Sequence, residues 1–85
     1  MSLDRHIGTR LRRLRLERGE KPEKIAIILS VSPKRYTAFE AGQDHLSVSH
    51  LIDLCTYLDV PVTYFFDGYE GIDEQKNPRS KDGTY

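Results

Sequence analysis

The chain has 85 residues, which is enough for one domain with a single modest hydrophobic core. Its 13 basic and 13 acidic side chains cancel, and this neutrality counts mildly against a nucleic-acid binder, which usually carries a basic face. There is no apolar run long enough to span a membrane and no secretory signal, and a single cysteine forms no internal disulfide, so we expect a cytoplasmic protein.

The first predicted element is a helix over residues 4–18. Three apolar side chains recur along it at the spacing of one helical face: Ile7, Leu11 and Leu14. Ser2 or Asp4 is expected to cap its start, and Gly19 is a suitable stop. Arginines are concentrated here, and we interpret most of them as the solvated face of the helix.

Two short helices are predicted next, over residues 22–30 and 33–41. The second has a strong start signal, a hydroxyl cap at Ser32 followed by Pro33 at the first helical position. Gly42 ends it. The side chains expected to face the core are Ile25, Ala26, Leu29, Tyr36 and Phe39.

A fourth helix is predicted after a cap at Ser47. Its apolar stripe is Leu51, Leu54, Cys55 and Leu58. The sequence Asp59-Val60-Pro61 breaks it, and residues 62–66 form a last short helical turn that brings Phe65 or Phe66 onto the core.

Together these elements predict an all-α, five-helix domain over residues 1–68. Residues 69–85 are polar and rich in glycine and charge, and we expect a flexible tail or linker there. No alternation of apolar and polar residues persists over the length of a strand, so we expect no β-strand.

Two short helices joined by a tight turn, with a longer helix before and another after, follow the helix-turn-helix plan. The segments IGTRLRRLRLERG, KIAIILSVSPKRYTAFEAGQ and LSVSHLIDLCTYLDVPVTYFFDG make the chain similar to the Cro/repressor-type (XRE) family of helix-turn-helix regulators over about residues 7–68. The similarity rests on a combination of anchors: Ile7, Gly8, Arg10, Leu14, Arg15, Gly19, Ala26, Leu29, Val31, Ser32, Glu40, Gly42, Leu51 and Leu58 to Pro61.

The resemblance implies a phage-repressor-like fold and a sequence-specific DNA-binding transcriptional regulator, expected to be a repressor and a homodimer. It also implies a structural salt bridge between Arg15 and Glu40 that joins the first helix to the third. Ala26 is expected where the second and third helices cross closely. Ser30 stands where the family usually has glycine, so we expect backbone strain or a changed turn there.

By position in the family, the helix over residues 32–41 enters the major groove. Four of its side chains are expected to face base edges: Pro33, Lys34, Thr37 and Ala38. Contacts to the DNA backbone or flank are expected from Lys21, Ser32, Arg35, Gln43, His45 and Ser47, with Arg10 as a further DNA-binding candidate. Lys34 and Arg35 can also be read as a solvated pair. Pro22 and the acidic Asp44 depart from the family pattern and lower the expected electrostatic affinity.

A second hypothesis is a protein-interaction or antitoxin-like module on the same scaffold, with weak DNA binding. A short helix cannot bury all its sides, so at least one of Ile27 and Ile28 is expected to be exposed or to contact a protein partner. Dimerisation is expected through aromatic and apolar side chains that exceed what the core can use: Val62, Tyr64, Phe66 and Tyr69.

We find no enzyme, metal site or cofactor site in the sequence. Cys55 lies on an apolar stripe and is expected to be a buried structural thiol. The three histidines, His6, His45 and His50, are scattered, and no spacing resembles a zinc site.

Overall fold

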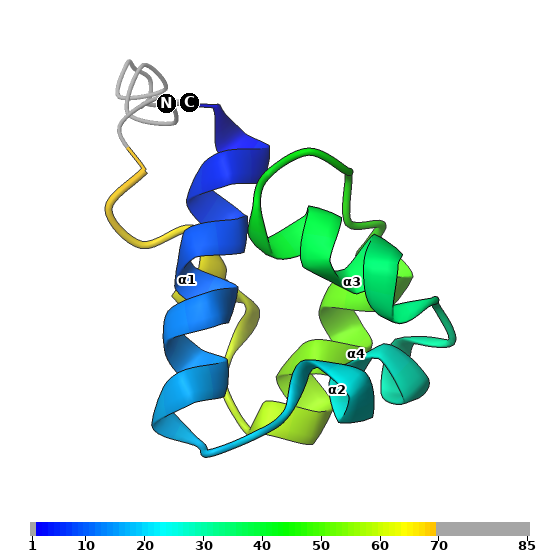
Figure 1. Ribbon diagram of the computed structural model, residues 1–85. Coiled ribbons are helices and arrows are strands. Elements are labelled where there is room, and N and C mark those ends of the chain that lie inside the picture. Colours follow the sequence, from blue (N-terminus) through cyan, green and yellow to red (C-terminus); the bar gives the residue numbers. More distant parts are fainter. Residues whose placement is uncertain (1, 70–85) are drawn as a thin grey trace, which may run out of the picture.

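The structure is a computed structural model that describes residues 2–69. Within them the chain forms four α-helices and one 3₁₀ helix: α1 (Leu3–Glu17), α2 (Pro22–Leu29), α3 (Pro33–Glu40), α4 (Val48–Leu58) and η1 (Val62–Phe65). No strand occurs in this part of the chain, and the all-α prediction is confirmed (Figure 1). The fifth element is a 3₁₀ turn, so the expected five-helix count holds only if it is included. The predicted tail lies outside the described residues, except for Tyr69.

Serine hydroxyls start three of the four α-helices. The side-chain oxygens of Ser2, Ser32 and Ser47 each accept a hydrogen bond from the backbone N–H three residues later, at 3.2, 3.1 and 3.1 Å. At α4 the ring of His50 also accepts the Ser47 backbone N–H at 3.3 Å, which completes a reciprocal cap. The first helix is therefore capped by Ser2 rather than Asp4.

Each of these α-helices is followed, one or two residues after its end, by a residue in the left-handed conformation. Those residues are Gly19, Ser30, Gly42 and Asp59, with φ of 67°, 59°, 73° and 58°. In each case the following residue donates its N–H to a carbonyl five positions back, at 2.9–3.1 Å. This closing motif satisfies carbonyl groups that would otherwise lack partners at the helix end.

The core draws side chains from all five elements. It consists of Ile7, Leu11, Leu14, Ile25, Ala26, Leu29, Tyr36, Phe39, Leu51, Leu54, Leu58 and Phe65. The predicted stripes of the first three helices are thus buried, and Phe65 rather than Phe66 is the fully buried aromatic after α4. Cys55 is only half-buried, because it lies at the edge of the α4 stripe, so the prediction of a buried thiol is wrong.

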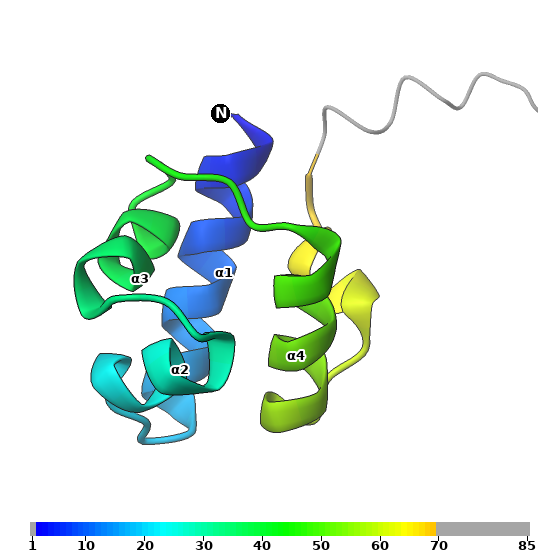
Figure 2. The ribbon, with the colours of Figure 1, turned by 90° about the vertical axis from the view of Figure 1, so that its right-hand side faces the viewer.

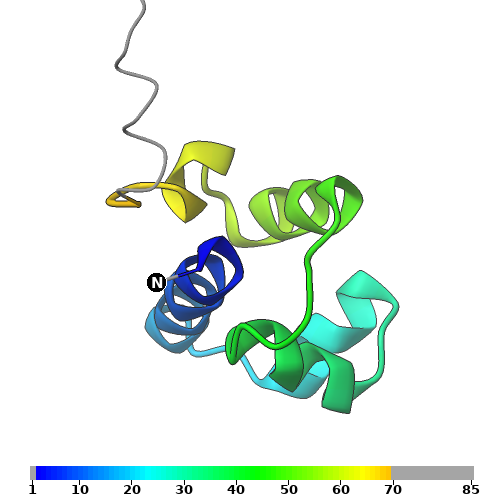
Figure 3. The same ribbon diagram turned by 90° about the horizontal axis from the view of Figure 1, so that it is seen from above.

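α1 lies between α3 and η1. It packs against α3 on one side and η1 on the other, while α2 packs against both α3 and α4 (Figures 2 and 3). Gly8 permits the crossing of α1 and α3, because a Cβ there would lie 2.4 Å from the carbonyl oxygen of Phe39. None of the helices within residues 2–69 is both long and apolar enough to cross a membrane.

Candidate nucleic-acid interface

The turn between α2 and α3 is built on Ser30. Its backbone lies at φ 59° and ψ 41°, its N–H donates to the Ile27 carbonyl at 3.0 Å, and the N–H of Val31 donates to the Ala26 carbonyl at 3.0 Å. The expected left-handed strain is present, and the turn keeps the regular hydrogen bonds of a helix end. α3 therefore leaves α2 in a defined direction.

α3 turns one face inward and the other to solvent. Tyr36 and Phe39 are 0% and 1% exposed, so this eight-residue helix is fixed by two buried aromatic rings. On the other side Pro33, Lys34 and Thr37 are exposed and Ala38 is half-buried. The Thr37 hydroxyl donates to the Pro33 carbonyl at 3.0 Å, which leaves its methyl group and its lone pairs on the outside.

A buried ion pair fixes α3 against α1. Arg15 Nε donates to Glu40 Oε2 at 2.6 Å, Arg15 Nη2 donates to Glu40 Oε1 at 3.2 Å, and both side chains are 11% exposed. The Tyr36 hydroxyl also donates to Glu40 Oε2, and Arg15 Nη1 donates to the Glu20 carbonyl at 3.1 Å. The hydrogen bond to Glu40 raises the pKa of Arg15, and burial raises the pKa of Tyr36, so both groups keep their protons.

Arg35 is bound within the protein. Its Nε donates to Asp44 Oδ2 at 3.0 Å, and its guanidinium lies 5.2 Å from the centre of the Phe39 ring. The backbone N–H of His45 and the Arg35 guanidinium hold the pKa of Asp44 below its ordinary value. Arg35 thus ties the loop after α3 to α3 itself and is less available to a phosphate than the sequence suggested.

The other expected backbone contacts lie before α2, at the start of α3 and in the loop between α3 and α4. Lys21, Ser32, Gln43, His45 and Ser47 are all exposed. His45 Nδ1 lies 3.1 Å from both carboxylate oxygens of Asp4, which connects the loop to the first turn of α1. Ser32 and Ser47 only accept hydrogen bonds as caps, so each hydroxyl proton remains available to an external acceptor.

Arg10 is not brought to this surface. Its Nε donates to the Tyr64 carbonyl, its guanidinium lies 4.1 Å from the centre of the Tyr64 ring, and Nη2 is 3.9 Å from Asp67 Oδ2. These contacts place it on the side of α1 that faces η1. Arg10 therefore holds η1 in place, and the structure gives no support to its predicted contact with DNA.

The residues predicted for dimerisation divide into two kinds. Val62 is 48% exposed, whereas Tyr64, Phe66 and Tyr69 are half-buried. The Tyr64 hydroxyl donates to the Arg10 carbonyl at 3.3 Å, and the Tyr69 ring lies 5.4 Å from that of His6. Tyr64 and Phe66 thus pack partly against the core of their own chain, and the use of the four residues in a dimer stays a prediction.

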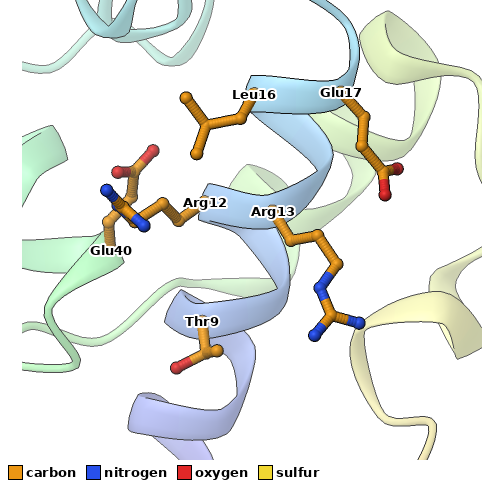
Figure 4. Close-up of a pocket in the computed structure, with 6 residues that line it drawn as sticks. All are labelled: Thr9, Arg12, Arg13, Leu16, Glu17 and Glu40. Atoms are coloured by element: carbon orange, nitrogen blue, oxygen red, sulfur yellow. The ribbon is translucent and has the colours of Figure 1, made fainter.

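A shallow groove that the sequence did not suggest runs between α1 and α3. It has a volume of about 460 Å³ and is lined by Thr9, Arg12, Arg13, Leu16, Glu17 and Glu40 (Figure 4). The arginines of α1 follow no pattern that separates those in this groove from those bound elsewhere. Only the crossing of the two helices brings Glu40 to the side of Arg12.

Residues 2–69 bring together no group of three or more side chains that could hold a metal ion. Burial raises the pKa of the Cys55 thiol, which makes the thiolate rarer at neutral pH.

The two short helices, the fixed turn and the exposed face of the second helix define a helix-turn-helix domain. The model of the helix-turn-helix domain family matches residues 6–63, so the chain belongs to that family. The resemblance to Cro/repressor-type (XRE) regulators is thereby confirmed.

Curated relatives cover the same region. An uncharacterized transcriptional regulator in the ATPase CF(0) region of Rhodospirillum rubrum is 34% identical over 68 residues, which are 80% of this chain and 63% of that protein. An uncharacterized helix-turn-helix-type transcriptional regulator of Sinorhizobium medicae is 30% identical over 69 residues, which are 81% of this chain and 50% of that protein. The chain thus spans between half and two thirds of the length of these relatives.

Two solved structures show the same fold. The restriction-modification controller protein C.AhdI from Aeromonas hydrophila is 29% identical, with a TM-score of 0.67 over 73% of this chain and 94% of that one. The clp gene regulator ClgR from Corynebacterium glutamicum is 23% identical, with a TM-score of 0.76 over 89% of this chain and 84% of that one, and this likeness concerns the fold alone.

Proposed function

We propose that this chain is a sequence-specific DNA-binding transcriptional regulator that inserts α3 into the major groove. The observation that carries the proposal is the exposed face of α3, which presents Lys34 and Thr37 from a helix fixed by Tyr36, Phe39 and the Arg15–Glu40 pair. The transcriptional regulators among the relatives support it. Repression rather than activation, and a cytoplasmic location, are parts of the same proposal.

The chemistry of the exposed face suggests what each side chain reads. Lys34 carries three N–H donors and suits the O6 and N7 acceptors of guanine. Thr37 offers a methyl group to thymine, and Pro33 and Ala38 offer apolar contact only. Exposed polar side chains before α2, at the start of α3 and in the loop after it suit backbone phosphates: Lys21, Gln43, His45 and the hydroxyls of Ser32 and Ser47.

The first test is a search for the binding site. Genomic fragments retained by the purified protein would be sequenced, and binding to the resulting duplex would be compared with binding to an unrelated duplex. Lys34→Ala should lower the preference for the selected duplex by about 1–3 kcal/mol. Arg13→Ala is the matched control, because it removes one exposed cation outside α3. If wild type retains no fragment even at low salt, the proposal fails.

We further propose that a second copy of the chain completes the regulator. Val62 is the most exposed of the four expected contact residues, and it begins η1, on the side of α1 away from α3. Sedimentation at rising concentration should show a dimer that Val62→Glu disrupts. A protein that stays monomeric at every concentration, both free and on DNA, would exclude this assembly.

A protein-interaction role is the alternative, and one observation favours it. Ile27 on α2 is 76% exposed, the highest fraction among the large apolar side chains of the described residues, whereas Ile28 is half-buried. A partner lost on Ile27→Glu together with Ile28→Glu, but kept by Ile52→Glu, whose isoleucine is 58% exposed on α4, would support it. An unchanged association state and unchanged partners would contradict it.

A further inference from the structure

The groove between α1 and α3 leads to the exposed face of α3. A second shallow hollow, lined by Arg12, Thr37, Glu40 and Ala41, lies next to the groove and shares two of its residues. Arg12 is thus the cation that lines both hollows, and Thr37 connects the second one to the face that is proposed to read bases. A ligand held on that face of α3 would pass close to Arg12.

The charges in the groove favour an anion beside Arg12, because Arg12 and Arg13 stand against one uncompensated carboxylate, that of Glu17. The carboxylate of Glu40 is already bound by Arg15 and the Tyr36 hydroxyl, so its charge is compensated at the groove floor. Arg12 is exposed, and it makes no ion pair within 4.0 Å with any acidic side chain of residues 2–69. Its guanidinium therefore keeps its donors for an external partner.

Most other arginines of the fold are not free in this way. Four of them hold tertiary contacts: Arg10 with Tyr64, Arg15 with Glu40, Arg18 with the Leu58 carbonyl at 3.1 Å, and Arg35 with Asp44. Arg5 and Arg13 are also exposed. Arg5 lines neither hollow, and Arg13 extends from α1 away from α3, whereas Arg12 extends toward it (Figure 4). The position of Arg12 next to α3, rather than its charge alone, distinguishes it.

We infer that Arg12 binds a backbone phosphate of the duplex that α3 enters, at the mouth of the groove beside Thr37. This inference rests on the proposed DNA-binding function. A guanidinium suits a phosphate because its planar N–H groups can donate to two phosphate oxygens at once. Such a contact adds affinity and fixes the position of α3, and it carries no sequence information.

The test compares Arg12→Ala with Arg13→Ala in the full chain. Binding to the selected duplex and to an unrelated duplex is measured by fluorescence anisotropy over a range of salt concentrations. Arg12→Ala should lose roughly tenfold in affinity for both duplexes at low salt, the effect of one charged hydrogen bond. The slope of log affinity against log salt should fall by about 0.9 per binding chain. Arg13→Ala should leave the affinity and the slope unchanged.

The outcomes separate this inference from the function on which it rests. Wild type that binds neither duplex overturns both. Wild-type binding with an unchanged slope in Arg12→Ala, or an equal loss in Arg13→Ala, overturns only the role of Arg12. So does a change in base preference, which would place Arg12 at a base edge. Equal melting temperatures of the two variants would confirm that the comparison concerns folded proteins.

A small free anion is the alternative ligand for the same groove. Inorganic phosphate titrated into the protein without DNA would be followed by NMR at Thr9 and Arg12. Saturable binding of phosphate, combined with unchanged DNA binding in Arg12→Ala, would assign the groove to a small anion and overturn the DNA contact. No saturable binding, with the expected change in salt slope, supports it.

Discussion

Replacing Ser30 by glycine should stabilise the domain. Ser30 is held at φ 59°, a conformation in which the Cβ of an L-residue approaches the following carbonyl oxygen. Its side chain is exposed and makes no hydrogen bond within residues 2–69, so its removal costs no packing. Glycine can adopt the same backbone without the steric cost and can keep the hydrogen bonds that close α2.

The size of the effect follows from two opposing terms. The left-handed conformation costs a residue with a Cβ roughly 1–2 kcal/mol. Glycine loses about 0.5–1 kcal/mol more conformational entropy on folding. The two ranges leave a net gain of about 0–1.5 kcal/mol; its midpoint, about 0.75 kcal/mol, raises the melting temperature of a domain of this size by roughly 3–6 °C.

Thermal unfolding followed by circular dichroism measures the gain, and two matched variants isolate its cause. Ser30→Ala removes the hydroxyl but keeps the Cβ, so it should give no comparable gain. Lys24→Gly places glycine at an exposed position inside α2, where it should destabilise by roughly 0.5–1 kcal/mol. Equal stabilisation by Ser30→Ala and Ser30→Gly, or none by Ser30→Gly, would refute the strain argument.

Three further changes test the crossing of α1 and α3 and the loop after it. Gly8→Ala puts a Cβ 2.4 Å from a main-chain oxygen of α3, so urea unfolding should show a loss of at least about 1–3 kcal/mol; wild-type stability would mean that the helices can separate there. Glu40→Gln leaves Arg15 buried without its counter-charge and should lower the free energy of unfolding by on the order of 3 kcal/mol in the same assay. Glu17→Gln, on the exposed face of α1, is the control and should cause a much smaller loss. The pKa of Asp44 is lowered in the folded state, so its bonds stabilise the fold above the unfolded pKa of about 4 and are lost as pH falls through the lower folded pKa. Acid should therefore destabilise wild type more steeply than Asp44→Asn. Parallel profiles of stability against pH for the two proteins would contradict this.

The sequence predicted those parts of the fold that depend on local chemistry. Helical spacing located the buried faces, as at Ile7, Leu11 and Leu14, because one residue in every three or four must face the core. Hydroxyl caps located the starts of α3 and α4 at Ser32 and Ser47, because the cap and its donor are only three residues apart. These signals involve neighbours in the chain and can be read without knowing the tertiary structure.

Contacts between distant elements could not be read in the same way. Arg10 and Arg12 are separated by less than one turn of α1. Arg10 nevertheless binds Tyr64 of η1, whereas Arg12 extends toward α3. Their roles depend on which element packs on each side of α1. The residues that decide this, Thr37 beside Arg12 and Tyr64 beside Arg10, lie 25 and 54 positions further along the chain. Gly8 was visible only as a family anchor, since nothing in its own neighbourhood shows that a carbonyl oxygen of α3 lies against it.

The use of arginines in the fold also explains how a neutral chain can belong to a family of regulators. Arg10, Arg15, Arg18 and Arg35 are bound within the domain, so these four cations are not available to phosphates. The remaining exposed cations of residues 2–69 are Arg5, Arg12, Arg13, Lys21, Lys24 and Lys34, and only those that face the duplex can contact its backbone. Each phosphate contact contributes about 0.9 to the slope of log affinity against log salt, so a single chain should show weak, shallowly salt-dependent binding. Two chains on one operator double the number of contacts and add the affinity of the second reading helix. We therefore expect tight binding to depend on the proposed dimer, and a Val62→Glu monomer should lose operator binding while each domain keeps its fold.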